Sequence, residues 1–451
     1  MPFNSLAFLA LLLASWCAVQ AFRRPAYVLI TASLVFYAVA GPFDTIVFLV
    51  TVSLNWLIQL SGLRARWKIT LAVLLNIGLI VGFKYKSLLL GAAGATGSYT
   101  DTGLPLGISF YCFQALAYHI DVARRQTAPA SSFASFFLFK SFFPQLVAGP
   151  IVRAHQFLPQ IERLFTGSRR RPRLIAFGLA LCALGLVKKV VFADSLAPLV
   201  DEIFMAPPES AYLAWLGAAL FTFQIYFDFS GYSDIAIGAA YLLGLRLPVN
   251  FLTPYISLGP REFWQRWHIS LSTWIRDYLY IPLGGRHGTW IRSAIVLVAS
   301  MALAGLWHGA NITFIIWGTA WGIYILLGRL WPCRLEVFAP LRWLVHMLIV
   351  VALWVLFRSP SFDFAMDYFR AMLSVSNWSI PEHGAPAGYV CTGIAGLFVL
   401  HWLEARAAGR PAVLILRRYD GPLLWGCLIS ISLILVLIPT AAVNPFIYFR
   451  F

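Results

Sequence analysis

Two histidines lie among tryptophans in a chain that is otherwise mostly apolar. His268 follows Trp264 and Trp267, and His308 follows Trp307 at the end of a run without charged residues. Ionisable side chains are costly at membrane depth and usually mark a function there. A neutral imidazole can accept the proton of a hydroxyl group near neutral pH. These two histidines are therefore our candidates for catalysis.

Motifs of the common alternative chemistries are missing from the sequence. It contains no Gly-x-Ser-x-Gly elbow, no phosphate-binding loop and no His-Glu-x-x-His zinc motif. A histidine-based mechanism is then the simplest chemical interpretation, and we predict no metal site. The remaining histidines carry weaker signals, and we assign none of them to catalysis: His119, His155, His287, His346, His383 and His401.

Small residues surround His308. If one helix continued through this segment, Gly305, Gly309 and Asn311 would be the spatial neighbours of His308. Small neighbours leave space for a ligand, or else they let a second helix pack closely. A helix-packing histidine bonded to a carbonyl is the structural alternative to a catalytic one.

His268 lies in a segment that alternates between apolar and charged residues. We predict an amphipathic helix between residues 261 and 280, with Trp264, His268, Leu271 and Ile275 on one face. Within the longer stretch 248–292 there are too many charges for a single membrane crossing, so helices lying at the surface or re-entering the membrane are expected. The structural alternative for His268 is an interfacial histidine in an aromatic belt.

The elements that must position these residues are membrane helices. The chain has 451 residues, of which 60% are hydrophobic and only 12% charged, whereas soluble domains carry about 25% charged residues. Long continuous apolar runs predict an all-α polytopic membrane protein with about 10–13 helices, in a single integral-membrane domain over residues 1–451. The predicted runs are 6–22, 27–40, 43–60, 69–83, 104–119, 174–192, 211–229, 233–245, 295–307, 313–330, 344–357, 389–402 and 423–439.

One further segment does not look like an ordinary span. Residues 133–153 are rich in aromatics but contain Pro144, Gly149 and Pro150. Such residues free backbone groups that must find partners in protein or water. We therefore predict a re-entrant or broken helix that lines a cavity.

Charge and cysteine content exclude several classes of protein. The net charge of +16 comes from basic clusters at segment ends. This is the positive-inside pattern of cytoplasmic loops, and it lacks the aromatic interleaving of a nucleic-acid groove. The six cysteines have no metal or redox spacing and are expected to be buried small hydrophobes. The first apolar run, 3–22, has no basic residues before it, so we interpret it as a retained helix with its N-terminus outside. The basic clusters at segment ends that give the net positive charge are residues 23–24, 64–68, 124–125, 169–173 and 417–418.

A polar patch interrupts the apolar runs near residue 230. Asp228 and Asp234 lie there together with Tyr226, Ser230 and Ser233. Buried carboxylates need partners. Our hypothesis is that one of the two aspartates pairs across helices, with an arginine as a candidate partner, and supports the wall around the site.

Several of these motifs together resemble a known family. Residues 262–285, EFWQRWHISLSTWIRDYLYIPLGG, are similar to the signature of membrane-bound O-acyltransferases, and most similar to the bacterial branch that O-acetylates alginate and related polysaccharides. Matching segments are LPLGISFY (104–111), FQAL (113–116), PQLVAGPIVR (144–153), GLVKKVV (185–191), YFDFSGYSD (226–234) and LWHGA (306–310). The likeness extends from about residue 36 to residue 449.

The resemblance implies a fold, a reaction and roles for residues. The implied fold is a helical bundle with re-entrant segments around a central tunnel. His308 is similar to the invariant catalytic histidine, and His268 matches the second conserved polar position. We count Trp307 and Asn311, with Asp228 and Asp234, as supports of the tunnel.

Substrates and partners also follow from the resemblance. It implies no bound cofactor, acetyl-coenzyme A as the cytoplasmic donor, and a polysaccharide acceptor outside the bacterial cytoplasmic (inner) membrane. A periplasmic or membrane-anchored, acetyltransferase- or esterase-like partner protein is also implied. Arg266 and Arg276 flank His268 and are candidates for the donor phosphates. The structural alternative is an ion pair with Glu262 or Asp277, or a lipid headgroup contact.

Two other functions remain open at this point. A related branch transfers D-alanine from a carrier protein to teichoic-type polymers. A transporter or channel with a histidine proton relay belongs to a different class altogether. The missing internal repeats and the several separate motifs favour the acetyltransferase.

Overall fold

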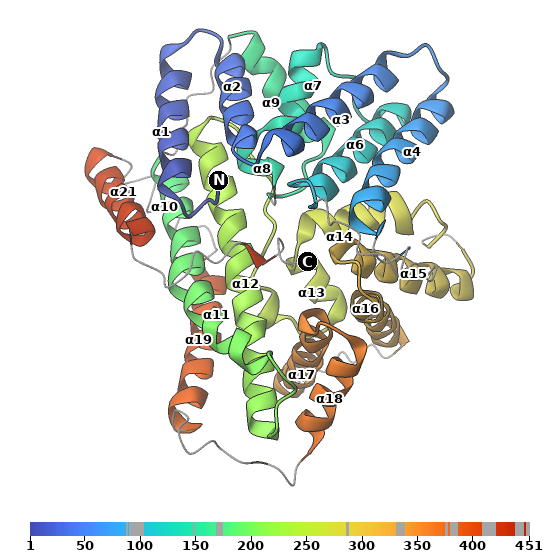
Figure 1. Ribbon diagram of the computed structural model, residues 1–451, viewed down its shortest axis with the longest axis vertical. Helices are drawn as coiled ribbons and strands as arrows, with labels where there is room; N and C mark the ends of the chain where they lie inside the picture. Colours follow the sequence, from blue (N-terminus) through green and yellow to red (C-terminus); the bar gives the residue numbers. More distant parts are fainter. Residues whose placement is uncertain are drawn as a thin grey trace. The chain divides into compact units, whose positions relative to one another are not determined.

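The structure is a computed structural model in which every regular element is a helix. It describes residues 1–86, 89, 103–147, 149–167, 175–285, 288–330, 339–374, 378, 387–407, 421–437 and 446–447, and no strand occurs among them. The all-α prediction is therefore confirmed (Figure 1). The basic clusters 169–173 and 417–418, together with His287, His383 and Cys333, lie outside the described residues.

Six helical segments are long and apolar enough to cross a membrane, and four shorter apolar helices accompany them. Six plus four gives ten apolar helices among the described residues, which agrees with the predicted polytopic class. The six segments are Pro42–Leu60, Ala65–Lys84, Ile175–Ile203, Trp290–His308, Ile312–Arg329 and Ala339–Arg358.

The chain forms two compact units. The first comprises Met1–Val187, Tyr232–Val249 and Ile415–Pro439, and the second comprises Lys188–Gly231, Asn250–Leu414 and Thr440–Phe451. The helices of the first unit are α1 (Leu6–Ala21), α2 (Pro25–Ala38), α3 (Pro42–Leu60), α4 (Ala65–Lys84), α6 (Ile108–Ala123), α7 (Phe133–Ser141), α8 (Phe143–Leu146), α9 (Ala154–Phe165), α10 (Ile175–Leu186) and α21 (Pro422–Leu437).

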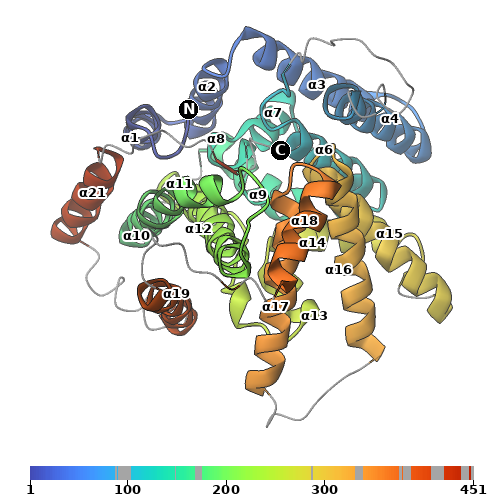
Figure 2. The same cartoon turned by 60° about the horizontal axis from the view of Figure 1, so that its bottom comes forward.

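The second unit contains both candidate histidines. Its helices are α11 (Asp194–Ile203), α13 (Pro260–Arg266), α14 (Ile269–Ile275), α15 (Trp290–His308), α16 (Ile312–Leu330), α17 (Ala339–Arg358), α18 (Phe362–Leu373) and α19 (Ala387–Ala407). Helices α17 and α18 lie together, as Figure 2 shows. Short irregular helices complete the unit: the π-helices η1 (Val187–Ala193) and η3 (Arg276–Tyr280), and the 3₁₀ turn η2 (Pro254–Ile256).

One predicted boundary between helices is wrong. The runs 211–229 and 233–245 are a single helix, α12 (Ala211–Leu242), which carries residues of both units. The polar patch lies inside this helix and does not end it. Asp228 pairs with a lysine from another element, described below.

The predicted broken helix over 133–153 is confirmed. Helix α7 ends at Ser141, the short α8 begins at Phe143, and α9 begins only at Ala154. Gly149 is required in this break because a Cβ atom there would lie 2.6 Å from the Cα of Gln145. Whether the segment lines a cavity stays a prediction.

A buried polar cluster links three helices of the first unit. The amides of Asn55 on α3 and Asn76 on α4 bond to each other at 2.9 and 3.2 Å, and Asn55 Oδ1 also lies 3.2 Å from Nε2 of His119 on α6. All three side chains are buried. Amides that bond across helices in this way hold apolar helices together.

Helices α15 and α16 of the second unit approach each other at glycines. A Cβ atom on Gly305 would lie 2.0 Å from the carbonyl oxygen of Phe314, and one on Gly318 would lie 2.1 Å from that of Met301. Of the two interpretations offered for small residues near His308, close helix packing is therefore the one observed at Gly305.

The cysteine prediction is only partly right. Cys112 and Cys182 are buried as expected, whereas Cys17 and Cys427 are exposed. Both exposed cysteines lie on short apolar helices, where an outward-facing side chain meets lipid instead of water.

Candidate active site

His268 lies at a break between two short helices. Helix α13 ends at Arg266 and α14 begins at Ile269, so the continuous amphipathic helix predicted over 261–280 is wrong. His268 has φ 41° and ψ 54°, which is the left-handed region. Residues other than glycine rarely adopt it, because it costs about 1–2 kcal/mol, and such strain concentrates at functional sites. No glycine or proline marks this break in the sequence.

Two backbone hydrogen bonds hold the break in place. Leu252 N–H donates to Arg266 O at 2.9 Å, and Ile269 N–H donates to Asn250 O at 2.9 Å. Segment 250–252, which has no regular secondary structure, therefore bonds to the chain on both sides of His268. The hydrogen bonds of segment 250–252 therefore stabilise the left-handed backbone of His268 in addition to the two short helices.

The side chain of Asn250 also contacts His268. Its Oδ1 lies 3.2 Å from His268 Nδ1, 3.2 Å from the Ser270 backbone nitrogen and 2.8 Å from Ser270 Oγ. Both Asn250 and His268 are 0% exposed. Among the described residues, Nε2 of His268 has no hydrogen-bond partner.

The surroundings of His268 keep the imidazole neutral. Rings of Phe229, Phe251 and Trp307 lie around it, with centroid distances of 4.7, 6.4 and 6.1 Å. Burial among these rings lowers the pKa of His268 from 6.5 to about 3. The imidazole is therefore neutral near neutral pH and can accept a hydrogen bond, although so low a pKa makes it a weak base.

His308 is the final residue of α15, and it too is buried in aromatic surroundings. Its ring lies 4.9 Å from Trp307, 5.2 Å from Trp317 and 5.2 Å from Phe357. Trp307 contacts both candidate histidines. Both candidate histidines therefore lie near the same tryptophan, and their roles in catalysis stay a prediction.

Asn311 does not lie on the helix of His308, contrary to the expectation from spacing. The chain is extended at Gly309, and Asn311 precedes α16, where its Oδ1 accepts from Thr313 N–H at 3.1 Å. Its Nδ2 donates to Pro360 O at 2.6 Å. Asn311 therefore ties the start of α16 to the segment after α17.

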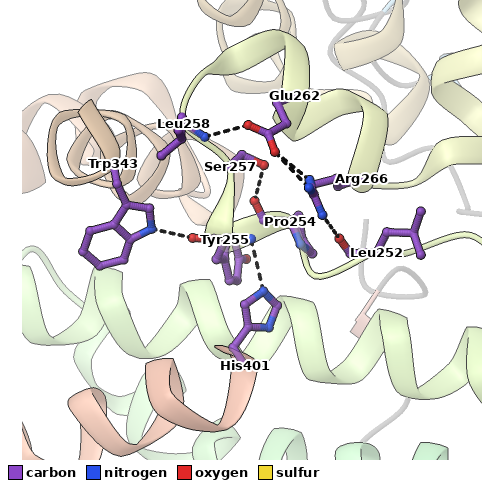
Figure 3. A network of polar contacts seen from close by, with 9 residues as sticks. All are labelled: Leu252, Pro254, Tyr255, Ser257, Leu258, Glu262, Arg266, Trp343 and His401. Atoms are coloured by element: carbon purple, nitrogen blue, oxygen red, sulfur yellow. Dashed lines mark hydrogen bonds and ion pairs between the residues drawn. The ribbon is translucent and has the colours of Figure 1, made fainter. Parts of the chain in front are cut away.

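The two arginines predicted to bind the donor are paired with carboxylates. Arg266 bonds to Glu262 through Nε and Nη2 at 2.9 Å each, and its Nη1 donates to Leu252 O at 3.1 Å (Figure 3). Arg276 Nε lies 2.7 Å from Asp277 Oδ1. These are the ion pairs named as the structural alternative, and phosphate binding by either arginine stays a prediction.

Glu262 and Arg266 form a clamp on the segment that follows Asn250, as Figure 3 shows. Glu262 Oε2 accepts from Leu258 N–H at 3.0 Å, so Glu262 joins Arg266 to the chain after η2. Tyr255 N–H donates to Nε2 of His401 at 3.2 Å, and Trp343 Nε1 donates to Tyr255 O at 2.7 Å. His401 thus has a structural partner at this loop.

Asp228 lies in a buried ionic network of the second unit. Lys189 Nζ lies 2.7 Å from Asp228 Oδ1 and 2.7 Å from Asp194 Oδ1, and all three side chains are at most 8% exposed. Asp228 Oδ2 accepts from Ile447 N–H at 2.6 Å. The suggested arginine partner is wrong, because the cation is a lysine in the π-helix η1. Asp234 belongs to the first unit.

Comparison with known proteins identifies this architecture. Residues 121–362, more than half of the chain, match the membrane-bound O-acyltransferase family, MBOAT. The chain belongs to this family. It is an integral membrane O-acyltransferase whose two candidate histidines fall within the matched region.

Individual relatives match over most of their length. The acyltransferase is 39% identical over 412 residues to "Probable alginate O-acetylase AlgI" of Azotobacter vinelandii, which covers 85% of this chain and 80% of the relative. A protein of the same name from Pseudomonas aeruginosa is 39% identical over 406 residues, with 85% and 76% covered. A "Peptidoglycan O-acetyltransferase" of Helicobacter pylori is 32% identical over 448 residues, with 89% and 84% covered.

The acyltransferase site contains residues that sequence reasoning did not single out. Asn250 was read only as part of a turn-rich stretch, and Lys189 only as part of a family segment. Asn250 acquires its role from His268, 18 positions away, and Lys189 pairs with Asp194 and Asp228, 5 and 39 positions away. A buried lysine in an apolar run was the one available signal, since such a charge requires a counter-ion.

Proposed function

We propose that this acyltransferase moves an acetyl group from cytoplasmic acetyl-coenzyme A to hydroxyl groups of a polysaccharide outside the inner membrane. The observation that carries the proposal is the pair of buried histidines whose rings both lie near that of Trp307. The names of these relatives, which concern alginate and peptidoglycan, support a carbohydrate acceptor. We propose His308 as general base or acyl relay, with His268 assisting it.

The chemistry required is acyl transfer from sulfur to oxygen. The acceptor oxygen bonds to the thioester carbonyl carbon while a histidine nitrogen takes the hydroxyl proton. The carbon–sulfur bond then breaks, and the proton passes to the sulfur of coenzyme A. Aromatic walls around His268 and His308 exclude water, which would otherwise hydrolyse the thioester.

A basic end on the α15–α16 pair supports a cytoplasmic donor. Arg292 lies in the first turn of α15 and Arg329 in the last turn of α16, while His308 ends α15 on the other side. Arg329 donates to Tyr280 OH at 3.2 Å, and Arg292 Nε donates to Leu283 O at 3.2 Å. Both arginines are held by neutral oxygens, and by the positive-inside rule this end is cytoplasmic.

Two pairs of arginines are now candidates for binding the phosphates of the donor. Replacing Arg292 and Arg329 by Gln should raise the KM for acetyl-coenzyme A by about tenfold, because charge-assisted bonds to phosphate are lost. The same exchange at Arg266 and Arg276 tests the assignment that sequence position suggested. Whichever pair raises the KM while sparing kcat is the donor contact.

Acceptor delivery is proposed to involve a second protein. The polymer lies outside the membrane, and a periplasmic or membrane-anchored acetyltransferase- or esterase-like partner would pass the acetyl group on to it. Purification of the tagged acyltransferase from its native membranes, followed by transfer assays with and without co-purifying proteins, tests this part.

The central experiment supplies labelled acetyl-coenzyme A to purified protein and follows label into polysaccharide. Wild-type protein should transfer label, and His308→Ala should lose transfer while remaining inserted and folded. His155→Ala is the control, since His155 lies outside the site. Substantial transfer by His308→Ala overturns the role of His308, and transfer of D-alanine in place of acetyl overturns the donor.

A further inference from the structure

We propose that Asn250 is a positioning residue that fixes the tautomer of His268. Nε2 of His268 is thereby left free of hydrogen and can accept a hydrogen bond from the hydroxyl group that receives the acyl group. This inference rests on the proposed acyl transfer and adds a residue that neither the sequence motifs nor the family match assigns. It depends on two buried polar contacts, taken in turn below.

The orientation of the Asn250 amide is determined by a backbone group. A backbone N–H can only donate, and that of Ser270 lies 3.2 Å from the Asn250 atom assigned as Oδ1. The facing atom must therefore be the oxygen and not the amide nitrogen. Ser270 Oγ, at 2.8 Å from the same atom, can donate to it as well. The choice between oxygen and nitrogen, which is often ambiguous for asparagine, is settled here.

That orientation determines where the proton of His268 lies. The same Oδ1 is 3.2 Å from His268 Nδ1, and an amide oxygen can only accept, so Nδ1 must carry the hydrogen. A neutral imidazole has one N–H, which leaves a lone pair on Nε2. Second-sphere hydrogen bonds commonly select the reactive nitrogen of a histidine in this way.

The remaining neighbours of His268 do not compete with this arrangement. The rings packed on it, from Phe229, Phe251 and Trp307, carry no charge. Asp228 precedes Phe229 on α12, and it is bonded to Lys189 and Ile447. Nε2 of His268 has no hydrogen-bond partner within the described part of the chain, and it is buried. A lone pair in this state is costly unless a ligand supplies a donor, and a hydroxyl group does so.

The strained backbone serves the same purpose. The left-handed conformation of His268 places its side chain beside Asn250 Oδ1, while Ile269 N–H bonds to the Asn250 carbonyl at 2.9 Å. The side chain of Asn250 thus contacts His268, and its main-chain carbonyl accepts from the next residue, Ile269. Such rigid support is what holds a reacting nitrogen in a fixed geometry.

Two substitutions at Asn250 test the proposal by different routes. Asn250→Asp keeps the acceptor oxygen but adds a charge that favours protonated His268, so the acid limb of the pH profile of kcat/KM should move up by about one pH unit or more. Asn250→Ala removes the acceptor and should lower kcat by about tenfold or more. An unmoved acid limb in Asn250→Asp, or a wild-type kcat in Asn250→Ala, overturns the proposal.

A matched control exists in the first unit. Asn55 lies 3.2 Å from the buried His119, so Asn55→Asp makes the same exchange beside a histidine without a proposed role. This variant should lose stability but leave the acid limb of kcat/KM in place. If its acid limb moves equally, the effect is general and does not belong to His268.

A readout without activity separates this proposal from the proposed function. The loss of melting temperature between about pH 7.5 and 5.5 should be smaller in Asn250→Asp than in the wild type, because the added carboxylate stabilises protonated His268. Absence of acetyl transfer by the wild type would overturn the proposed function alone. An unchanged pH dependence of melting in Asn250→Asp would overturn the role of Asn250, even where transfer is confirmed.

Discussion

The two units each bury a histidine against an asparagine, and the two pairs differ in the backbone that carries them. In the His119 pair, Asn55 Oδ1 lies 3.2 Å from Nε2 of His119, and in the His268 pair, Asn250 Oδ1 lies 3.2 Å from Nδ1 of His268. Residue types, distance and burial are nearly the same. Composition and contact alone therefore do not decide which histidine is functional.

The difference lies in the elements that carry the pairs. Asn55 and His119 stand on regular helices, and Asn55 is completed by a reciprocal amide bond to Asn76. Asn250 lies in a segment without regular secondary structure, and His268 adopts a left-handed backbone between two short helices. A relaxed pair on straight helices stabilises helix packing, whereas a strained pair at a chain break fixes one nitrogen in a chosen direction.

Substitution of each histidine should give the largest difference between the two pairs. His268→Gln is expected to lower kcat by about 10²-fold, because the acceptor nitrogen is lost. His119→Gln should retain the wild-type rate per folded molecule and lose about 1 kcal/mol of stability, the value of one buried hydrogen bond. Acetyl transfer normalised to folded protein measures the first effect, and thermal unfolding measures the second. Equal rates in the two variants would remove the functional distinction between the pairs.

Acidification should reveal the buried neutral state of His268. The pKa of His268 is about 3 in the folded protein, against 6.5 as its ordinary value, so the unfolded chain binds the extra proton between these limits. Stability from the neutral ring is therefore complete above about pH 6.5 and is lost as the pH falls toward 3. At about pH 5.5 the loss amounts to about 1 kcal/mol. The fall in melting temperature from pH 7.5 to 5.5 should be smaller in His268→Gln, and an identical fall would contradict a neutral His268.

Loosening the clamp around the His268 pair should give the smallest effect. Glu262→Gln removes the charge that binds Arg266, whose side chain is 30% exposed, so the pair is worth well under 1 kcal/mol after solvent screening. We expect kcat/KM to fall by about twofold to fivefold as segment 250–258 loosens. Asp367→Asn breaks the exposed pair with Arg370 on α18 and is the control. Equal losses in the two variants would show that the clamp does not support the site.

Much of the fold could be predicted from the sequence because it depends on local patterns. Apolar runs gave most helices to within a few residues, and Pro144, Gly149 and Pro150 marked the broken segment correctly. The exception is α12, where Asp228 and Ser233 suggested a boundary. A helix can carry such residues when a distant partner satisfies them, and a local pattern does not show the partner.

The site could be predicted only in part, for the same reason. His268 and His308 stood out by residue type and surroundings, and the rings of both lie near that of Trp307. The break at His268 was missed because Trp267 and His268 are compatible with a helix, and only the bonds of segment 250–252 favour the left-handed backbone. Asn250 and Lys189 were missed because their partners are remote in sequence.

The contact between Asp228 and Ile447 has a consequence for biosynthesis. These residues are 219 positions apart, and Phe446 packs on Phe229, which in turn packs on His268. At a synthesis rate of about 5–20 residues per second, the ribosome needs about 10–40 seconds to make the intervening chain. During this interval α12 must wait in the membrane with one carboxylate oxygen still lacking its final donor. A nascent acyltransferase therefore cannot form the contacts of Asp228 and Phe229 with residues 446–447 until these residues have emerged from the ribosome.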